Sequence, residues 1–395
     1  MSELQSYLTP TPASVPIITR GNAFWRNGER FLIKGISYLP RRPDHDGQPD
    51  PLTDDRLEEL KQDIDLFHEL GLNSISVRGL NPTEDHSNAL KLLEKEGIYV
   101  MVHIRDTILP PKHPHIRGRS TFDENSDPAA YYTLHIIKDT LSLINQLADH
   151  PNVLSLAVDA RVEQPALPLN APLTKLATVH RALIRDAKAF LQARKGREVP
   201  VGISIGSTTT HRLSLLQYFS AGEPTERADY FAMECYSWAG RSSFQISGWK
   251  DMVGELGRAS PIPMLLSAYS NNVMRPNRAW DEVLCLYSLD MTGVFSGGFA
   301  FTFSDHVTKP YGVVGVGADG QRQRRQGFYS LKEKSVIVDA RSLEEVGMAE
   351  DKDYEKWRGE FPDQQERSGW FASPNMLAYP GDWEQTLTEL KHEKQ

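Results

Sequence analysis

The sequence predicts a closed (β/α)8 barrel, and three observations favour this fold class. Predicted strands alternate with predicted helices over about 300 residues, which is typical of a parallel sheet. The alternation repeats about eight times, as a barrel of this class requires. No glycine-rich dinucleotide fingerprint follows the first predicted strand, and this disfavours an open doubly wound sheet.

Each predicted element follows from a local pattern. Asn27-Gly28 is a two-residue turn signal, so a hairpin that leads into a strand is expected over 22–38. Apolar residues at spacings of three and four form one stripe over 54–70 and predict the first helix, which Gly71 ends. The same patterns predict the later elements, which are strands at 74–78, 98–104, 153–158, 199–205, 230–236, 264–267 and 298–303 and helices at 85–96, 129–149, 172–195, 211–220, 249–257 and 279–292.

The overall composition excludes several classes of protein. Of the 395 residues, 44 are Lys or Arg and 52 are Asp or Glu, so the net charge is −8. An acidic chain of this kind is not expected to bind nucleic acid or an anionic membrane. We find no apolar run of about 18 residues and no signal-peptide pattern, so neither a membrane anchor nor secretion is expected. Two cysteines are too few for a disulfide scaffold, and a cytoplasmic location is expected.

The chain is expected to divide into three parts. Residues 1–14 are a flexible Pro/Thr/Ser-rich lead, and residues 15–335 form the barrel. Residues 336–395 are charged and contain Trp357, Trp370 and Trp383, so we expect an irregular extension packed on the barrel.

Residues at the C-terminal ends of the strands are the candidates for a functional site, because barrel enzymes build their sites there. Period-two alternation puts Asp159 with Arg161, and Glu234 with Tyr236, on one face of their strands. The candidate residues are Tyr38, Arg78, His103, Arg105, Asp159, Arg161, Glu234, Tyr236, Trp238, Ala268, Tyr269 and Asp305.

Seven stretches between about residue 15 and about residue 335 resemble one known family. They are Phe31-Leu-Ile-Lys-Gly-Ile-Ser-Tyr-Leu-Pro40, Asp50-Pro51-Leu52, Glu69-Leu-Gly-Leu-Asn73, Asn81-Pro-Thr-Glu-Asp-His86, His150-Pro-Asn-Val-Leu154, Gly240-Arg-Ser-Ser-Phe244 and Phe295-Ser-Gly-Gly298. Through them the chain resembles the fungal β-1,3-glucanosyltransferases of glycoside hydrolase family 72. The resemblance implies a barrel fold and two catalytic glutamates, in secreted enzymes that cut and rejoin cell-wall glucan.

The sequence departs from the family at both catalytic positions. Retaining glycoside transfer needs two carboxyls about 5–5.5 Å apart. The aligned runs are Asp159-Ala160-Arg161-Val162 and Ser267-Ala268-Tyr269-Ser270, so Arg161 stands at the acid/base position and Ala268 at the nucleophile position. A guanidinium cannot deliver a proton near neutral pH and a methyl group cannot attack an anomeric carbon. The comparison therefore predicts that the family's retaining mechanism is lost.

The family's half-cystines are also missing. The aligned positions are Leu60, Ala89, Ala221, Ala239 and Asn271. Their loss fits a reducing compartment and agrees with the expected cytoplasmic location.

The altered strand ends predict an anionic ligand. Arg78, Arg105 and Arg161 form a cationic wall, and arginine forks match carboxylate and phosphate. His103 stands where the family has an acid and, like Glu234 and Asp159, is a candidate for handling protons. Two alternatives stay open. The arginines could be neutralised by ion pairs of Arg161 with Asp159 and of Arg78 with Glu234, and His103 could belong to the core.

Aromatic and polar residues complete the predicted substrate site. Tyr38, Tyr236, Trp238 and Tyr269 offer aromatic surface, although such rings are often packing, and Asp305 follows the last strand. No cofactor is expected. No metal is expected either, because the loose cluster of Asp106, His113 and His115 lies in a Pro/Arg-rich loop. The basic run Arg322-Gln-Arg-Arg325 is interpreted as a solvated turn.

Three functions fit these observations. The leading hypothesis is a repurposed intracellular enzyme, of lyase, isomerase or cyclase type, that uses acid/base residues at the barrel mouth on a small anionic substrate of specialised metabolism. The alternatives are a non-catalytic protein that kept the glucan-binding groove, and a glucanosyltransferase or glycosidase with an unorthodox pair built on Glu234 or Asp159.

Overall fold

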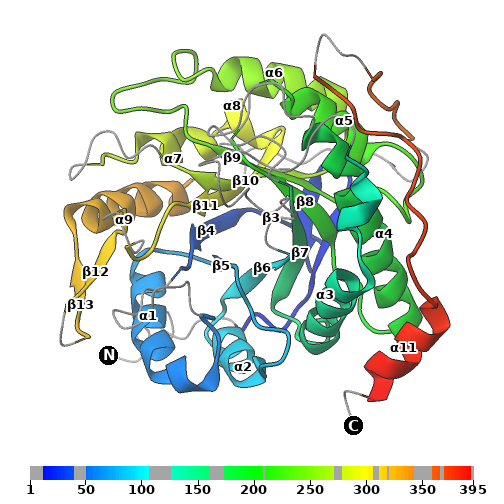
Figure 1. Ribbon diagram of the computed structural model, residues 1–395. Helices are drawn as coiled ribbons and strands as arrows, with labels where there is room; N and C mark the ends of the chain where they lie inside the picture. Colours follow the sequence, from blue (N-terminus) through cyan, green and yellow to red (C-terminus); the bar gives the residue numbers. More distant parts are fainter. Residues whose placement is uncertain are drawn as a thin grey trace, which may run out of the picture.

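The predicted (β/α)8 barrel is confirmed. In the computed structural model, parallel strands close on themselves in the order β10-β11-β4-β5-β6-β7-β8-β9, and Figure 1 shows them inside a ring of helices. The structure describes residues 12–39, 50–105, 126–160, 173–207, 210–270, 278–305, 311–317, 320–341, 358–364 and 369–392.

The barrel strands and the helices that cover them alternate along the chain. The strands are β4 (Ile33–Ser37), β5 (Ser74–Val77), β6 (Tyr99–Arg105), β7 (Val153–Ala160), β8 (Val201–Ile205), β9 (Phe231–Cys235), β10 (Met264–Tyr269) and β11 (Phe295–Ala300). The helices are α1 (Leu57–Glu69), α2 (Ser87–Lys95), α3 (Leu134–Leu147), α4 (Ala177–Arg194), α5 (Arg212–Ser220), α6 (Trp249–Ala259), α7 (Asp281–Leu286), α8 (Leu289–Thr292) and α9 (Gln326–Asp339). Short 3-10 turns at Asp54–Arg56, Pro128–Tyr131 and Leu173–Leu176 precede α1, α3 and α4.

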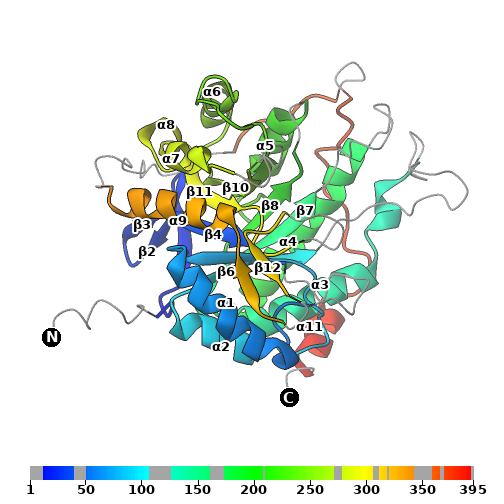
Figure 2. The same cartoon turned by 90° about the vertical axis from the view of Figure 1, so that its left-hand side faces the viewer.

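A small antiparallel sheet closes the N-terminal end of the barrel. It consists of β1 (Ile17–Arg20), β2 (Ala23–Arg26) and β3 (Glu29–Phe31), of which β1 was not predicted. Phe24 packs on Tyr230 with ring centroids 5.5 Å apart, and Phe31 packs on Tyr99 at 5.2 Å. These four rings fill the N-terminal end of the barrel interior, and Figure 2 shows the small sheet to one side of the barrel strands. The opposite, C-terminal end of the strands is the barrel mouth, at which a site can form.

Two elements differ from the sequence-based expectation. The single helix expected over 279–292 is split into α7 and α8, because the backbone of Ser288 is extended and its hydroxyl donates to the carbonyl of Cys285. An antiparallel hairpin of β12 (Val314–Val316) and β13 (Arg322–Arg324) was not predicted and lies between α1 and α9 (Figure 1).

The described C-terminal residues contact the helices on one side of the barrel. The Tyr218 hydroxyl donates to the carbonyl of Ser373 at 2.6 Å, and Trp370 is buried against the Tyr218 ring. The last described helix is α11 (Trp383–His392), and its Glu389 forms an ion pair with Lys138 of α3. The boundaries of the three predicted parts stay predictions.

Among the helices in the described ranges, we find none with the length and apolar character that crossing a bilayer requires.

The two thiols are expected to react slowly in the folded protein. Cys235 and Cys285 are both free, Cys235 is buried, and burial raises the pKa of Cys285 to about 11. Because the thiolate is the reactive form, we expect a disulfide-exchange reagent near neutral pH to modify Cys285 only slowly, and both cysteines at once after unfolding. A titration that finds fewer than two thiols in unfolded, unreduced protein would contradict this. The cytoplasmic location stays a prediction.

Candidate functional site

One side of the barrel mouth holds a chain of hydrogen-bonded polar side chains from β5, β6 and β7. Asp159 accepts a hydrogen bond from Nδ1 of His103 at 2.7 Å, and its other carboxylate oxygen pairs with Arg78. Nε2 of His103 is hydrogen-bonded to the hydroxyl of Ser76 at 3.0 Å. The His103 and Asp159 side chains are almost fully buried, whereas the Arg78 side chain keeps 12% of its surface exposed.

This arrangement revises the predicted cationic wall. Arg78 pairs with Asp159, where the sequence had suggested Glu234 as its partner. The Asp159 charge therefore neutralises Arg78, and the buried His103 also bonds to that carboxylate. The Arg105 side chain and the whole of Arg161 lie outside the described residues, so the rest of the wall stays a prediction.

The opposite side of the mouth brings Glu234 next to Ala268. The two residues are register partners on the parallel strands β9 and β10, and paired residues of neighbouring strands point to the same face of a sheet. Glu234 is partly exposed, whereas Ala268 is buried. A carboxyl thus lies one strand away from the position at which the resemblance places the nucleophile.

A row of aromatic rings lies on the same side of the mouth. The rings of Tyr236 and Phe301 are 6.0 Å apart, and those of Phe301 and Tyr311 are 6.1 Å apart. All three are partly exposed, and they follow β9 and β11, the two strands that flank β10. Of these residues, only Tyr236 was predicted. Phe301 was missed because the last strand was expected to continue to 303 and in fact ends at Ala300.

Three of the predicted aromatic residues pack between the barrel and its helices. Tyr38 packs on Phe67 at 5.3 Å, Trp238 on Trp249 at 5.1 Å, and Tyr269 on Trp280 at 6.4 Å. All three are at least 94% buried. For Tyr269 the physical reason is strand alternation, because it directly follows Ala268, which shares a face with Glu234, and therefore points to the opposite face of β10.

The predicted site residue Asp305 has a structural partner. Its carboxylate pairs with Arg325 and accepts a hydrogen bond from the backbone of Gly312 at 3.0 Å. Asp305 therefore connects the end of β11 to Gly312 and Arg325.

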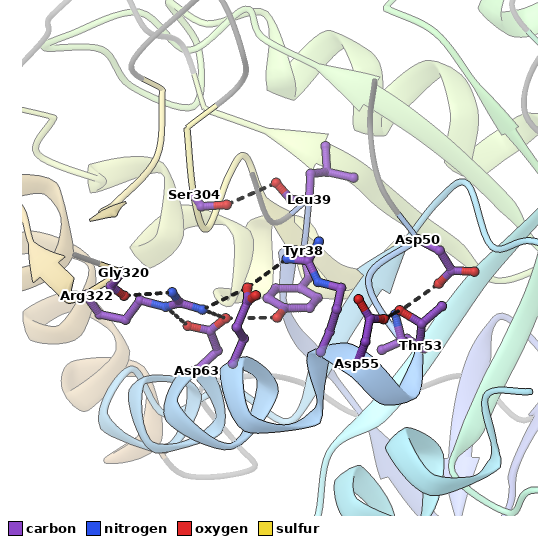
Figure 3. A network of polar contacts seen from close by, with 12 residues as sticks. Tyr38, Leu39, Asp50, Thr53, Asp55, Asp63, Ser304, Gly320 and Arg322 are labelled. Carbon is purple, nitrogen blue, oxygen red and sulfur yellow. Dashed lines mark hydrogen bonds and ion pairs between the residues drawn. The ribbon is translucent and has the colours of Figure 1, made fainter. Parts of the chain in front are cut away.

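The sequence analysis also missed a polar network on the outer side of β4 (Figure 3). Asp63 of α1 accepts a hydrogen bond from the Tyr38 hydroxyl at 2.8 Å and two from Arg322 at 2.7 and 3.0 Å. Glu59 lies 3.6 Å from Arg322 and bonds to the buried Arg56 at 2.9 Å. Burial raises the pKa of Asp63 and the pKa of the Tyr38 phenol.

This network is structural, because it joins α1 to the hairpin of β12 and β13. The interpretation of Arg322 as part of a solvated turn is wrong, since its side chain is 11% exposed and bonded to a buried carboxylate.

No group of three or more metal-ligating side chains occurs in the part of the chain that the structure describes. Asp106, His113 and His115 lie outside that part.

Comparison with known proteins shows where this barrel belongs. The sequence model of the glucanosyltransferase family, Glyco_hydro_72, matches residues 8–339. The 1,3-beta-glucanosyltransferase gas4 of Schizosaccharomyces pombe is 31% identical over 333 residues, which are 82% of this chain and 68% of that protein. The 1,3-beta-glucanosyltransferase gel1 of Aspergillus fumigatus is 32% identical over 308 residues, which are 78% of this chain and 63% of gel1.

Two of the similar solved structures contain laminari-oligosaccharides. Saccharomyces cerevisiae Gas2p in complex with laminaritriose and laminaritetraose matches with a TM-score of 0.77 and 27% identity, over 94% of this chain and 78% of Gas2p. A second Gas2p structure, in complex with laminaripentaose, also has a TM-score of 0.77.

These findings overturn the leading functional hypothesis. The prediction of a repurposed enzyme for a small anionic substrate is wrong, because the relatives are glucanosyltransferases and the solved neighbours bind laminari-oligosaccharides, which carry no charge. The pairing of Arg78 with Asp159 also removes one of the cations on which that hypothesis depended. The match over residues 8–339 and the similarity to these relatives show that the chain belongs to the glucanosyltransferase family, glycoside hydrolase family 72.

Proposed function

We propose that the barrel mouth binds β-1,3-linked gluco-oligosaccharides. The row of Tyr236, Phe301 and Tyr311 carries this proposal, because partly exposed aromatic faces offer the apolar surface on which the C–H faces of a glucose ring pack. Laminari-oligosaccharides bound to Gas2p support the choice of linkage. The chain spans only 63% of gel1, so activities that need the whole length of the relatives are proposals as well.

Removing the central ring is expected to abolish most of this binding. Phe301 contacts both other rings, so Phe301→Ala should weaken laminaritriose binding by roughly tenfold or more, measured by isothermal titration calorimetry. Tyr329→Ala is the matched control, because Tyr329 is 52% exposed on α9 and its loss should leave the affinity unchanged. Maltotriose, an α-1,4-linked oligosaccharide, should not bind. Equal affinities of the Phe301 variant and the unmodified protein would contradict the proposal.

Transfer of glucan is a second candidate function, favoured by the position of Glu234 beside Ala268. In a retaining transfer without the family's acid, a carboxylate bonds to the anomeric carbon while the glycosidic bond breaks and its oxygen takes a proton from a water molecule. An acceptor hydroxyl then displaces the carboxylate and gives its proton to the hydroxide that this water left. Glu234 is the described carboxylate closest in register to the family's nucleophile position, so we assign it the attacking role.

Product analysis separates transfer from binding alone. Incubation with laminarihexaose should give oligosaccharides longer than the donor, and Glu234→Gln should abolish them while oligosaccharide binding persists. If the unmodified protein yields no such products, or if the Glu234 variant yields them equally, this second candidate is rejected and the binding proposal stands.

A further inference from the structure

The two sides of the barrel mouth differ in chemistry. The chain Arg78–Asp159–His103–Ser76 lies at β5, β6 and β7, and the aromatic row follows β9 and β11, on either side of β10. The strand order puts β6 across the barrel from β10, and Figure 1 shows the two groups of strands on opposite sides of the ring.

The polar side is already occupied by its own hydrogen bonds. Both oxygens of Asp159 have cationic or N–H partners, and both ring nitrogens of His103 are bonded. Asp159 and His103 are about 98% buried, as is Ser76. Arg78, the residue after β5, keeps 12% of its side-chain surface exposed and is paired with Asp159.

A neutral sugar chain cannot replace these interactions. A glucan hydroxyl that displaced Arg78 would leave the buried Asp159 carboxylate without its counter-charge, and unpairing a buried ion pair is strongly unfavourable. A glucan that packs on the aromatic row meets no such penalty, because those rings are partly exposed before binding.

We propose that the Arg78–Asp159 pair, supported by His103 and Ser76, closes the β5–β7 side of the mouth and thereby limits the glucan site to a short segment over β9–β11. Arg78 and Asp159 are then specificity-determining residues for oligosaccharide length, and His103 is a positioning residue that acts through Asp159. This inference rests on the proposed glucan binding.

The dependence of affinity on chain length tests the proposal in the unmodified full chain. We titrate laminaribiose, laminaritriose, laminaritetraose, laminaripentaose and laminarihexaose by calorimetry. The affinity should rise over the shortest members and then level off, with laminaritriose and laminarihexaose within about twofold of each other. A laminarihexaose affinity on the order of tenfold above that of laminaritriose would overturn the inference and leave the proposed function intact. If no member binds, the proposed function itself fails.

A paired substitution tests the role of the ion pair directly. Arg78→Met together with Asp159→Asn removes both charges at similar volume, so laminarihexaose should then bind roughly tenfold tighter than laminaritriose. Lys138→Met with Glu389→Gln is the matched control, because it removes an ion pair between α3 and α11 and should leave the length series flat. A thermal melt establishes that each variant is folded. Equal affinities for laminaritriose and laminarihexaose in the folded Arg78/Asp159 variant would overturn the role assigned to the ion pair. If that variant does not fold, the length dependence measured with the unmodified protein tests the proposal.

Discussion

Replacing Arg322 by methionine is expected to lower the free energy of unfolding by about 3–5 kcal/mol near neutral pH. Arg322 donates two hydrogen bonds to Asp63, which is 1% exposed (Figure 3). Methionine preserves much of the packing volume but leaves a buried carboxylate whose remaining partner is the Tyr38 hydroxyl. Chemical denaturation monitored by circular dichroism measures the loss.

The matched control for this prediction lies in the same hairpin. Arg324 pairs with Glu69 at a partly exposed position, so Arg324→Met should cost less than about 1 kcal/mol. The double variant Arg322→Met with Asp63→Asn should recover part of the loss, because no charge is then left unpaired. Equal effects of the Arg322 and Arg324 substitutions would contradict the assignment of Asp63 as a buried charge that needs Arg322.

The loss caused by Arg322→Met should also depend on pH. Burial already raises the pKa of Asp63 in the folded protein, and removing the guanidinium raises it further. A carboxyl whose pKa is higher in the folded state than in the unfolded state favours folding at low pH, and this contribution is lost as the pH rises through the folded-state value. The destabilisation relative to the unmodified protein should therefore be smaller at about pH 5 than at about pH 8.

Gly297→Ala is expected to destabilise the barrel by about 2–5 kcal/mol. Gly297 lies in β11 with φ at +88°, a conformation that alanine adopts only with strain. An added Cβ would also lie within 3.0 Å of the Ile33 carbonyl oxygen in β4, and a backbone atom in a closed barrel cannot move aside as a side chain can.

Gly248→Ala separates the two causes. Gly248 also has a positive φ, at +76°, but nothing lies within 4 Å of its missing Cβ. The strain alone should cost about 1–2 kcal/mol there. If the two variants lose equal stability in denaturant titrations, the close approach of β11 to β4 contributes nothing.

Local patterns in the sequence predicted the barrel because they report directly on secondary structure. The apolar stripe over 54–70 corresponds to a 3-10 turn at Asp54–Arg56 followed by α1, and the alternation of strands and helices led to the correct fold class. The strand ends likewise indicated that Asp159, His103 and Glu234 would lie at the barrel mouth.

The same patterns could not predict side-chain partners. Arg322 and Asp63 are 259 residues apart in sequence, and nothing local to either residue indicates their pairing. The register shift in β10 between Leu266 and Ala268 is equally invisible, because a bulge leaves no mark in the hydrophobic pattern.

The functional conclusion changed for a related reason. Residue types at the strand ends suggested an anionic ligand, because each arginine was counted as a charge available to a substrate. In the folded barrel the Arg78 charge is neutralised by Asp159, and the partly exposed aromatic row of Tyr236, Phe301 and Tyr311 is the surface on which we propose that a neutral sugar binds.

The sequence by itself determined the fold class, the family resemblance and which residue types stand at the strand ends, because periodicity and motif spacing are properties of neighbouring residues. Folding was needed to show that Asp159 binds both Arg78 and His103, that Tyr38 and Tyr269 face the helices, and that one aromatic row joins residues after β9 and β11. The physical reason is that charge pairing and burial depend on distances between side chains from separate strands, and barrel closure sets these distances.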